Sequence, residues 1–389
     1  MPYKYLIDNL DFPYCDGCGH TFINKKLADA FAKMDIKPSK INLVSDIGCV
    51  GLVDKMFLTN TIHTTHGRSA AFATGLQLAD QILFDNDAIH VVMIGDGGST
   101  IGLLHLVEAA KMNANITVIL HNNFVYGMTG GQNSGLTPEN FRTATTMSGA
   151  MVPNIHIVNL LAAAHGGFLA RKLATDKDLD DTIVEAIKYP GFSLVEVVEL
   201  CTGYAIKWNS LAKKDIETIL ENSDSGERGT LVKRNDRENF GSLYAKNFPK
   251  KELQDKIKTI EKRTIQDQIK LDIVISGSAG EGIQFAAKTL IEAALKQGSN
   301  VMQKNDNPVT IGTGFSMSEV KISSDEILYS GITSPDYLLI GSLDGFNRAQ
   351  EFIKNTINEK AKSTIIIDSS LVEKLDKYDG FTIISDDFR

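Results

Sequence analysis

The stretch "AIHVVMIGDGGSTIGLLHLVEAAKMNANITVILHNN", residues 88–123, contains a complete strand–turn–helix–strand pattern. Its two outer runs are largely apolar and end in Gly-Asp and Asn-Asn, which is typical of buried parallel strands. The segment between them, at 100–113, has helical spacing. This order of elements indicates a parallel sheet that is covered by helices on both faces.

The same alternation continues on both sides of this stretch. Apolar runs at 41–48 and 191–200 predict two more buried strands, and the segment at 66–83 has the small-residue face of a packed helix. We therefore expect an α/β fold with a doubly wound parallel sheet. In such folds, ligands bind at the carboxyl ends of the strands.

A second, smaller α/β unit is predicted nearer the C-terminus. Residues 271–298 have the pattern of a strand, a glycine turn and a long helix. Further strand-like runs lie at 315–323, 337–344 and 363–370.

The alternation of elements suggests three parts of the chain. We predict a first domain at 1–205, a peripheral tail and linker at 206–268, and a second domain at 269–389. The tail includes a highly charged helical stretch at 249–268.

Composition narrows the class of protein. With 389 residues, 43% hydrophobic and 23% charged, the chain has the composition of a soluble globular protein of about two domains. The net charge of −8 argues against nucleic-acid binding. No apolar run is long enough for a membrane span, and the N-terminus lacks the pattern of a signal peptide. We therefore expect a cytoplasmic location.

Polar side chains follow two of the predicted strands. Asp96 comes directly after one strand, and the pair Asn122–Asn123 ends the next. Carboxylate and amide oxygens at neighbouring strand ends suit Mg²⁺, with substrate phosphates completing the site. Gly97 would let backbone N–H groups approach a diphosphate. The alternative is a glycine-rich turn and an asparagine turn that bind nothing.

The four cysteines form no familiar knuckle pair. Cys15 and Cys18 make a C-x-x-C, whereas Cys49 and Cys201 stand alone. Spacing favours a metal site, either zinc or iron–sulfur. A thioredoxin-like redox pair would leave the last two cysteines unused, and these could be small buried hydrophobes. His20 is predicted to be a local hydrogen-bond partner.

GDG at 95–97 followed by NN at 122–123 resembles the thiamine diphosphate (ThDP) signature. The resemblance narrows to the β subunit of 2-oxoacid:ferredoxin oxidoreductases and covers roughly residues 10–205. The motifs that carry it are "YCDGCGH" (14–20), "DIGCVG" (46–51), "HTTHGRSAAFATGLQLA" (63–79), the segment at 95–138, and "ELCTGY" (199–204).

The resemblance implies a set of site residues. All four cysteines, Cys15, Cys18, Cys49 and Cys201, should hold one [4Fe–4S] cluster. The side chains of Asp96 and Asn123 and the carbonyl of Val125 should bind Mg²⁺. The residues expected to line ThDP are Ile47, Gly48, Cys49, Val50, His66, Gly97, Gly98, Gly127 and Met128, with Thr129 supporting the same loop.

The implied activity is the CoA-acylating oxidative decarboxylation of a 2-oxoacid, with electrons passing through the cluster to ferredoxin or a ferredoxin-like subunit. An α subunit should supply the pyrimidine-binding domain and the activating glutamate, so no catalytic residue is assigned here. The substrate could be pyruvate, a branched-chain or aryl 2-oxoacid, or 2-oxoglutarate. Leu52 stands where relatives acting on 2-oxoglutarate often carry lysine, which disfavours a distal carboxylate.

Residues 271–389 resemble the γ domain of the same enzymes, although the region looks short. Gly277, Gly280 and Gly282 have the spacing G-x-x-G-x-G, which is not the dinucleotide fingerprint. Two rival functions stay open at this point. One is a cluster-free ThDP decarboxylase or carboligase, and the other is a non-catalytic scaffold subunit.

Overall fold

The computed structural model describes residues 4–84, 86–211, 215–224, 226–248, 268–307, 314–329, 331–359, 362–375 and 378–388. The chain forms two compact units, Met1–Ile257 and Lys258–Arg389, and each is described by itself. The domain boundaries expected after residues 205 and 268 stay predictions. The charged stretch at 249–268 lies outside the described residues, apart from Gln268.

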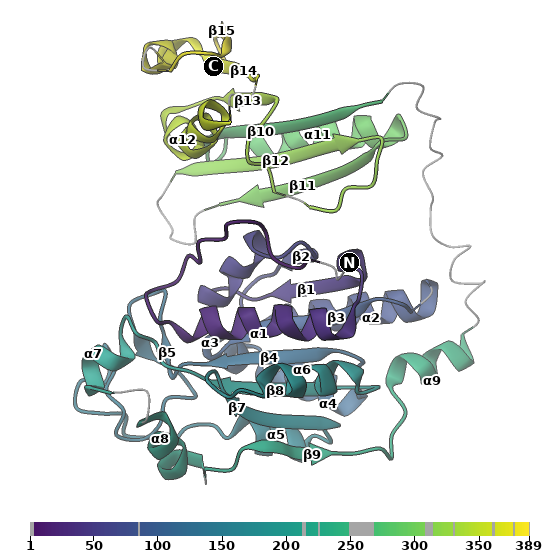
Figure 1. Ribbon diagram of the computed structural model, residues 1–389, viewed down its shortest axis with the longest axis vertical. Coiled ribbons are helices and arrows are strands. Elements are labelled where there is room, and N and C mark those ends of the chain that lie inside the picture. The colour runs from purple at the N-terminus through teal and green to yellow at the C-terminus, as the bar shows by residue number, and fades with distance from the viewer. Residues whose placement is uncertain are drawn as a thin grey trace. The chain divides into compact units, whose positions relative to one another are not determined.

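The first unit is built on a seven-stranded sheet with the order β2-β1-β3-β4-β8-β7-β9 (Figure 1). The strands are β1 (Ile41–Ser45), β2 (Asn60–His63), β3 (Ile89–Gly95), β4 (Thr117–Asn122), β7 (Phe168–Leu173), β8 (Ser193–Val198) and β9 (Gly229–Lys233). All neighbours pair in parallel except β9, which pairs antiparallel with β7. The four predicted strands are present, and the doubly wound α/β fold is confirmed. The sequence interpretation missed β2, β7 and β9.

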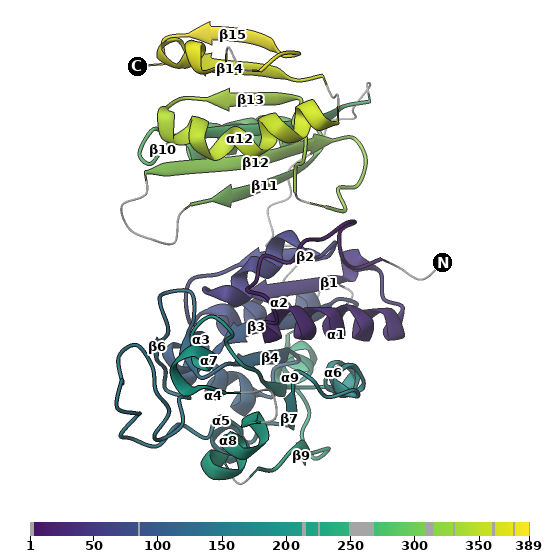
Figure 2. The ribbon, with the colours of Figure 1, turned by 60° about the vertical axis from the view of Figure 1, so that its left-hand side comes forward.

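Helices cover both faces of this sheet (Figure 2). On one face, α1 (Gly19–Met34) and α6 (Leu179–Lys188) pack on side chains such as Leu43 and Met93. On the other, α2 (Ser69–Leu83), α4 (Leu103–Met112) and α5 (Ile157–Ala163) pack on their strand neighbours Val44 and Val92. Successive residues of the strands thus point to opposite layers, as the pleat requires.

Shorter elements surround this core. They are η1 (Pro38–Lys40), η2 (Cys49–Lys55), α3 (Asp96–Ile101), the hairpin of β5 (Val125–Tyr126) and β6 (Gln132–Asn133), α7 (Ala205–Asn209), α8 (Asp215–Asp224) and α9 (Phe240–Asn247). Within the described ranges, no helix has both the length and the apolar character that a membrane span requires.

The direction of the connections changes between β1 and β3. The chain leaves β1 for β2 on one side and leaves β3 for β4 on the other. The register sets Gly95 beside His121 and Asn122 beside Val198, so the residues that follow these strands share one edge of the sheet. Ligands bind at such switch points in doubly wound folds.

The second unit has a six-stranded mixed sheet with the order β11-β12-β10-β13-β14-β15. Its elements are β10 (Lys270–Ser278), α11 (Ile283–Lys296), β11 (Asn300–Asp306), β12 (Phe315–Ser323), β13 (Tyr337–Ile340), α12 (Leu343–Asn358), β14 (Thr364–Asp368), η3 (Ser369–Leu375) and β15 (Thr382–Asp386). Helix α11 packs on one face and α12 on the other. Strands β11 and β15 were not predicted.

Candidate cofactor and metal site

Asp96 begins α3 immediately after β3, and only 5% of its surface is exposed. Its Oδ1 accepts a hydrogen bond from the backbone N–H of Gly97 at 2.8 Å. Its Oδ2 is buried and has no hydrogen-bond partner among the described residues. Burial raises the pKa of Asp96 to about 7, although the neighbouring Ser134 side chain and the backbone N–H of Gly97 oppose this rise. A bound cation would satisfy this oxygen, so the residue fits a magnesium site.

The two asparagines at the end of β4 have different surroundings. Asn122 donates its Nδ2 to Glu196 Oε1 at 2.8 Å and so belongs to the packing of the sheet. Asn123 lies beyond the strand end, and its Oδ1 accepts the backbone N–H of Val125 at 3.2 Å. Between them and β5, Phe124 has a φ of +68°, a left-handed conformation that turns the chain. The turn sets Val125 next to the predicted ligand Asn123.

The β5–β6 hairpin carries the next group of predicted residues. Thr129 Oγ1 donates to Gln132 Oε1 at 2.6 Å and lies 3.3 Å from the carbonyl of Tyr126, so it joins the two ends of this loop, while its place beside ThDP stays a prediction. Gly130 and Gly131 have φ values of +118° and +82°, so glycine closes the turn without strain. Met128 is 40% exposed at the tip.

Glycines bring the GDGG turn close to two other segments. A Cβ at Gly97 would lie 3.0 Å from the ring of Tyr126 and 3.4 Å from Cε1 of His66. A Cβ at Gly98 would lie 2.5 Å from Oδ1 of Asp46, closer than real Cβ atoms come. Glycine is therefore needed at Gly98 for sterics alone. The predicted residues His66, Gly97 and Gly98 do lie together.

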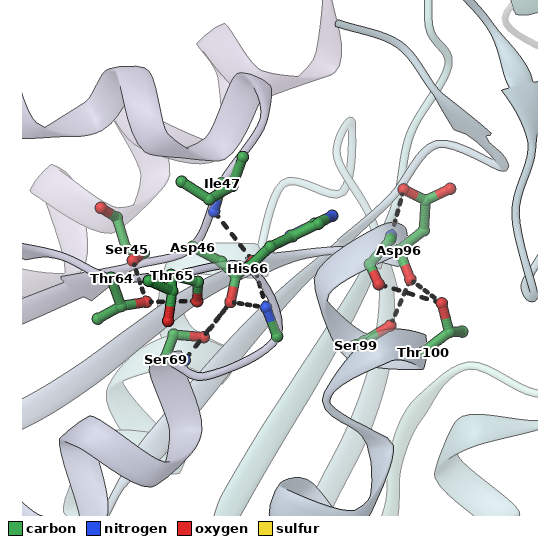
Figure 3. Close-up of polar contacts among 12 residues, drawn as sticks. Ser45, Asp46, Ile47, Thr64, Thr65, His66, Ser69, Asp96, Ser99 and Thr100 are labelled. Carbon is green, nitrogen blue, oxygen red and sulfur yellow. Dashed lines mark hydrogen bonds and ion pairs between the residues drawn. The ribbon is translucent and has the colours of Figure 1, made fainter. Parts of the chain in front are cut away.

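Asp46, which the sequence interpretation did not single out, organises this part of the site (Figure 3). It is fully buried, and its Oδ1 lies 2.6 Å from Nδ1 of His66. It also accepts from the backbone of Ile47 and Gly67 and from Ser69 Oγ, at 2.9, 3.0 and 2.8 Å. Burial would raise the pKa of Asp46, but these hydrogen bonds outweigh it and lower the pKa.

The Asp46 contact fixes the orientation of the His66 ring, which is 38% exposed. With Nδ1 on the carboxylate, Nε2 is left for another partner. The sequence does contain a signal that could have identified Asp46. Asp46 follows a buried strand directly, as Asp96 does.

The remaining ThDP-lining predictions fall on the loop between β1 and η2 and on the start of η2. Gly48 has a φ of +111°, which glycine adopts readily. Val50 is buried, and a Cβ at Gly95 would lie 3.7 Å from its Cγ1, which places this loop against the end of β3. Ile47 precedes Gly48 in this loop, and Cys49 follows it as the first residue of η2.

Three of the four cysteine sulfurs surround two glycines. A Cβ at Gly127 would lie 3.5 Å from Cys201 Sγ and 3.8 Å from Cys49 Sγ. A Cβ at Gly203 would lie 3.5 Å from Cys15 Sγ and 4.0 Å from Cys201 Sγ. The predicted ligands therefore approach one another although they come from three parts of the chain.

The thiols are free, and no disulfide competes for them. Burial and the neighbouring acidic groups, Cys201 foremost among them, raise the pKa of Cys49 to about 12. Burial likewise raises the pKa of Cys201, against hydrogen bonds from nearby backbone groups. Gathered thiols that resist ionisation fit a site that needs a soft cation to become thiolates.

The fourth cysteine, Cys18, is buried before α1, where its backbone N–H donates to the carbonyl of Cys15 at 3.0 Å. Its Sγ lies 3.6 Å from Nδ1 of His20, which makes His20 a local partner as expected. The same Nδ1 lies 2.8 Å from Oε1 of Glu199. Sulfur, imidazole and carboxylate come within 4.8 Å of one another, a spacing that could also hold a metal ion.

Comparison with known proteins identifies the family. Residues 46–197 match the model of the thiamine pyrophosphate enzyme, C-terminal TPP binding domain. Residues 272–388 match the model described as pyruvate ferredoxin/flavodoxin oxidoreductase. The first match contains the GDGG turn, the paired asparagines and the His66 loop, and the second covers most of the second unit.

Individual relatives agree with these matches. The 2-oxoglutarate synthase subunit KorB of Methanothermobacter marburgensis is 34% identical over 264 residues, which cover 66% of this chain and 90% of that protein. The 2-oxoacid:ferredoxin oxidoreductase subunit beta of Saccharolobus solfataricus is 34% identical over 196 residues, 49% of this chain and 62% of that one.

A solved structure has the same fold. It is the 2-oxoglutarate:ferredoxin oxidoreductase from Magnetococcus marinus with 2-oxoglutarate, coenzyme A and succinyl-CoA bound. Its TM-score is 0.55 at 25% identity, and the match covers 66% of this chain and 95% of that one. The chain therefore belongs to the 2-oxoacid:ferredoxin oxidoreductase family, as a thiamine diphosphate-binding β subunit followed by a γ-like domain.

Proposed function

We propose that this oxidoreductase subunit holds ThDP, Mg²⁺ and one [4Fe–4S] cluster side by side at the carboxyl edge of its first sheet. The observation that carries the proposal is the position of Gly127. It lies in the hairpin that starts with Val125, and it borders the sulfurs of Cys49 and Cys201. One hairpin would therefore contact both the metal of the cofactor and the cluster.

The magnesium ligands would be Asp96, Asn123 and the carbonyl of Val125. The orphaned Oδ2 of Asp96 supports this assignment, because a buried carboxylate oxygen without a donor is costly unless a cation binds. The cofactor itself would lie against Ile47, Gly48, Cys49, Val50, His66, Gly97, Gly98, Gly127, Met128 and Thr129.

The four cysteines would hold the cluster. Cys49 belongs both to this set and to the segment that would line ThDP. The distance that electrons cross between the cofactor and the cluster would therefore be short. When bound, ThDP would supply the carbanion chemistry that releases CO₂ from a 2-oxoacid, and the cluster would accept single electrons. Asp46 keeps Nδ1 of His66 occupied, so this ring can offer only Nε2 to a ligand.

The reaction we propose is the oxidative decarboxylation of a 2-oxoacid to an acyl-CoA, with ferredoxin or a ferredoxin-like subunit as electron acceptor. The ligands in the Magnetococcus marinus enzyme, 2-oxoglutarate, coenzyme A and succinyl-CoA, support this class. An α subunit would complete the site with its pyrimidine-binding domain. We place the enzyme in the cytoplasm, as its composition suggests.

The substrate side chain is open to test. Several relatives are named as 2-oxoglutarate synthases, whereas Leu52 in η2 offers no charge to a distal carboxylate. The uncharged Leu52 favours pyruvate or a branched-chain or aryl 2-oxoacid over 2-oxoglutarate.

The decisive experiment is anaerobic co-purification of the full chain with its α partner. Iron, sulfide and thiamine are measured first, and then a panel of 2-oxoacids is assayed with coenzyme A and a viologen dye. About four iron atoms per chain and CoA-dependent dye reduction are expected. Thiamine without iron would instead indicate the cluster-free decarboxylase, and the absence of both would indicate the scaffold subunit.

Two variants separate the two sites. Asp96→Ala should remove thiamine and leave the iron content unchanged, since this carboxylate would ligate only Mg²⁺. Loss of iron as well would contradict the separation of the sites. A control, Asn122→Ala, changes the neighbouring asparagine, which donates to Glu196 and would not ligate Mg²⁺, and should keep both thiamine and iron.

A further inference from the structure

A buried charged group lies beside the proposed cluster and takes no part in the cofactor site. Glu199 follows β8 directly and is 1% exposed. Its Oε1 lies 2.8 Å from Nδ1 of His20, in the first turn of α1, and 3.5 Å from Nδ1 of His121 in β4. The two imidazole rings lie close together, with centroids 4.6 Å apart and ring planes tilted by 30°.

Gly19 provides the space that the Glu199 side chain occupies. A Cβ at Gly19 would overlap both the Cβ and the carboxylate of Glu199. Glycine at the start of α1 therefore lets the helix approach the end of β8. A carboxylate without a counter-charge is unfavourable in such a place, and His20 is the nearest group that can supply one.

The orientation of the His20 ring determines which neighbouring atom can form a hydrogen bond with Nδ1. Neither carboxylate oxygen of Glu199 receives a hydrogen bond of acceptable geometry from a described residue, in spite of the short distance to the ring. The contact from Nδ1 to Cys18 Sγ, at 3.6 Å, does have the geometry of a hydrogen bond to sulfur. Nδ1 thus faces two acceptors, the Glu199 carboxylate oxygen and the Cys18 sulfur, so we assign the ring proton to this nitrogen, from which it can be donated to the sulfur.

We propose that Glu199 and His20 are positioning residues that present an N–H donor to the Cys18 sulfur and so make the cluster easier to reduce. This rests on the four-cysteine cluster of the proposed function. Reduction adds negative charge to the cluster and its thiolates, and a hydrogen bond to a ligating sulfur stabilises that charge. Electrons leaving the cofactor would then find a better acceptor.

The test is a redox titration, followed by EPR, of the cluster in the complex co-purified with its α partner. His20→Phe removes the donor, His20→Asn keeps an amide N–H near the position of Nδ1, and His121→Phe alters the other imidazole beside the carboxylate. We expect His20→Phe to lower the equilibrium constant for reduction of the cluster about tenfold. This corresponds to a fall of about 59 mV in the reduction potential of a one-electron couple. His20→Asn should restore most of the shift, and His121→Phe should change it little.

A second readout needs no substitution. With ¹⁵N-labelled histidine in the wild-type complex, electron–nuclear double resonance of the reduced cluster should detect one coupled nitrogen and an exchangeable proton. This measurement decides the matter if His20→Phe fails to fold.

The failures are distinguishable. A wild-type complex without cluster iron would refute the proposed function itself. A loaded wild-type complex whose potential matches that of His20→Phe, or whose cluster shows no histidine coupling, would refute the present inference and leave the proposed function standing. Equal shifts in His20→Phe and His20→Asn would also refute it, because they would reflect packing and not the donor.

Discussion

Asp46→Asn tests whether this buried carboxylate organises the His66 loop. The change keeps the shape of the side chain but replaces one acceptor oxygen with a donor. At least one of the N–H groups of Gly67 and Ser69, which now donate to the carboxylate, must then face an amide N–H. Loss of charge-assisted bonds together with one unsatisfied buried donor should lower the free energy of unfolding by about 2–3 kcal/mol.

Asp54→Asn is the matched control, because Asp54 is also 2.6 Å from Nδ1 of a histidine, His63. Its other partner is a hydroxyl, Ser45 Oγ at 2.7 Å, which can reverse and accept from the new amide. The His63 side chain is 43% exposed and can turn to water. The expected loss is therefore about 1 kcal/mol or less.

The assay uses the fluorescence of Trp208, the one tryptophan of the chain, which lies in α7 and so reports on the first unit. Urea unfolding of the full cofactor-free chain gives the midpoint and slope for each variant. Equal losses for Asp46→Asn and Asp54→Asn would refute the reasoning. So would an Asp46→Asn chain as stable as the wild type.

The pH dependence gives an independent check with a definite sign. Hydrogen bonds hold the pKa of Asp46 below its ordinary value in the folded state. Its contribution is therefore complete above the unfolded pKa of about 4 and is lost as the pH falls through the lower folded value. Between about pH 5 and pH 2, the wild-type chain should lose more stability than Asp46→Asn. Parallel curves would contradict a depressed pKa.

Three further predictions address packing and ligation. Gly19→Ala should destabilise the first unit by about 2–4 kcal/mol through overlap with the buried carboxylate, whereas Gly75→Ala in α2, with nothing within 4 Å, should stabilise it by about 0.5–1 kcal/mol, both measured by urea unfolding. Glu196→Ala should cost about 3–5 kcal/mol, because it breaks the buried pair with Arg171 at 2.8 Å, and Glu196→Gln should cost clearly less. Cys201→Ser should lower the iron content of the anaerobic complex, and full iron content would contradict the four-ligand assignment.

The sequence was informative where local pattern decides structure. The run at 88–123 predicted β3, the following helices and β4, because apolar periodicity and strand-end residues are local properties. β7 and β9 were missed for different reasons. β7 (Phe168–Leu173) carries buried Arg171 and Lys172, which interrupt an apolar run, and β9 is a partly exposed edge strand.

The candidate site likewise contains some residues that local sequence predicts and others that depend on long-range contacts. Asp96 follows β3, and the two asparagines end β4 and follow it, so their positions could be predicted from the sequence. The role of Asp46 depends on His66, which lies about twenty positions further along the chain. The ring of Tyr126 in β5 approaches Gly97 in α3, a different part of the chain. The spacing of residues along the chain does not predict such contacts, because they form only when the folded sheet packs.

The buried pair also bears on how the cysteines come together. His20 lies two residues after Cys18, and Glu199 lies two residues before Cys201. Their contact therefore fixes the start of α1 to the end of β8, and it does so with protein groups alone. If a metal were the only organiser, the metal-free chain would tolerate Gly19→Ala. Because a Cβ at Gly19 would overlap the buried Glu199 side chain whether or not a metal is bound, the substitution should destabilise the metal-free chain as well.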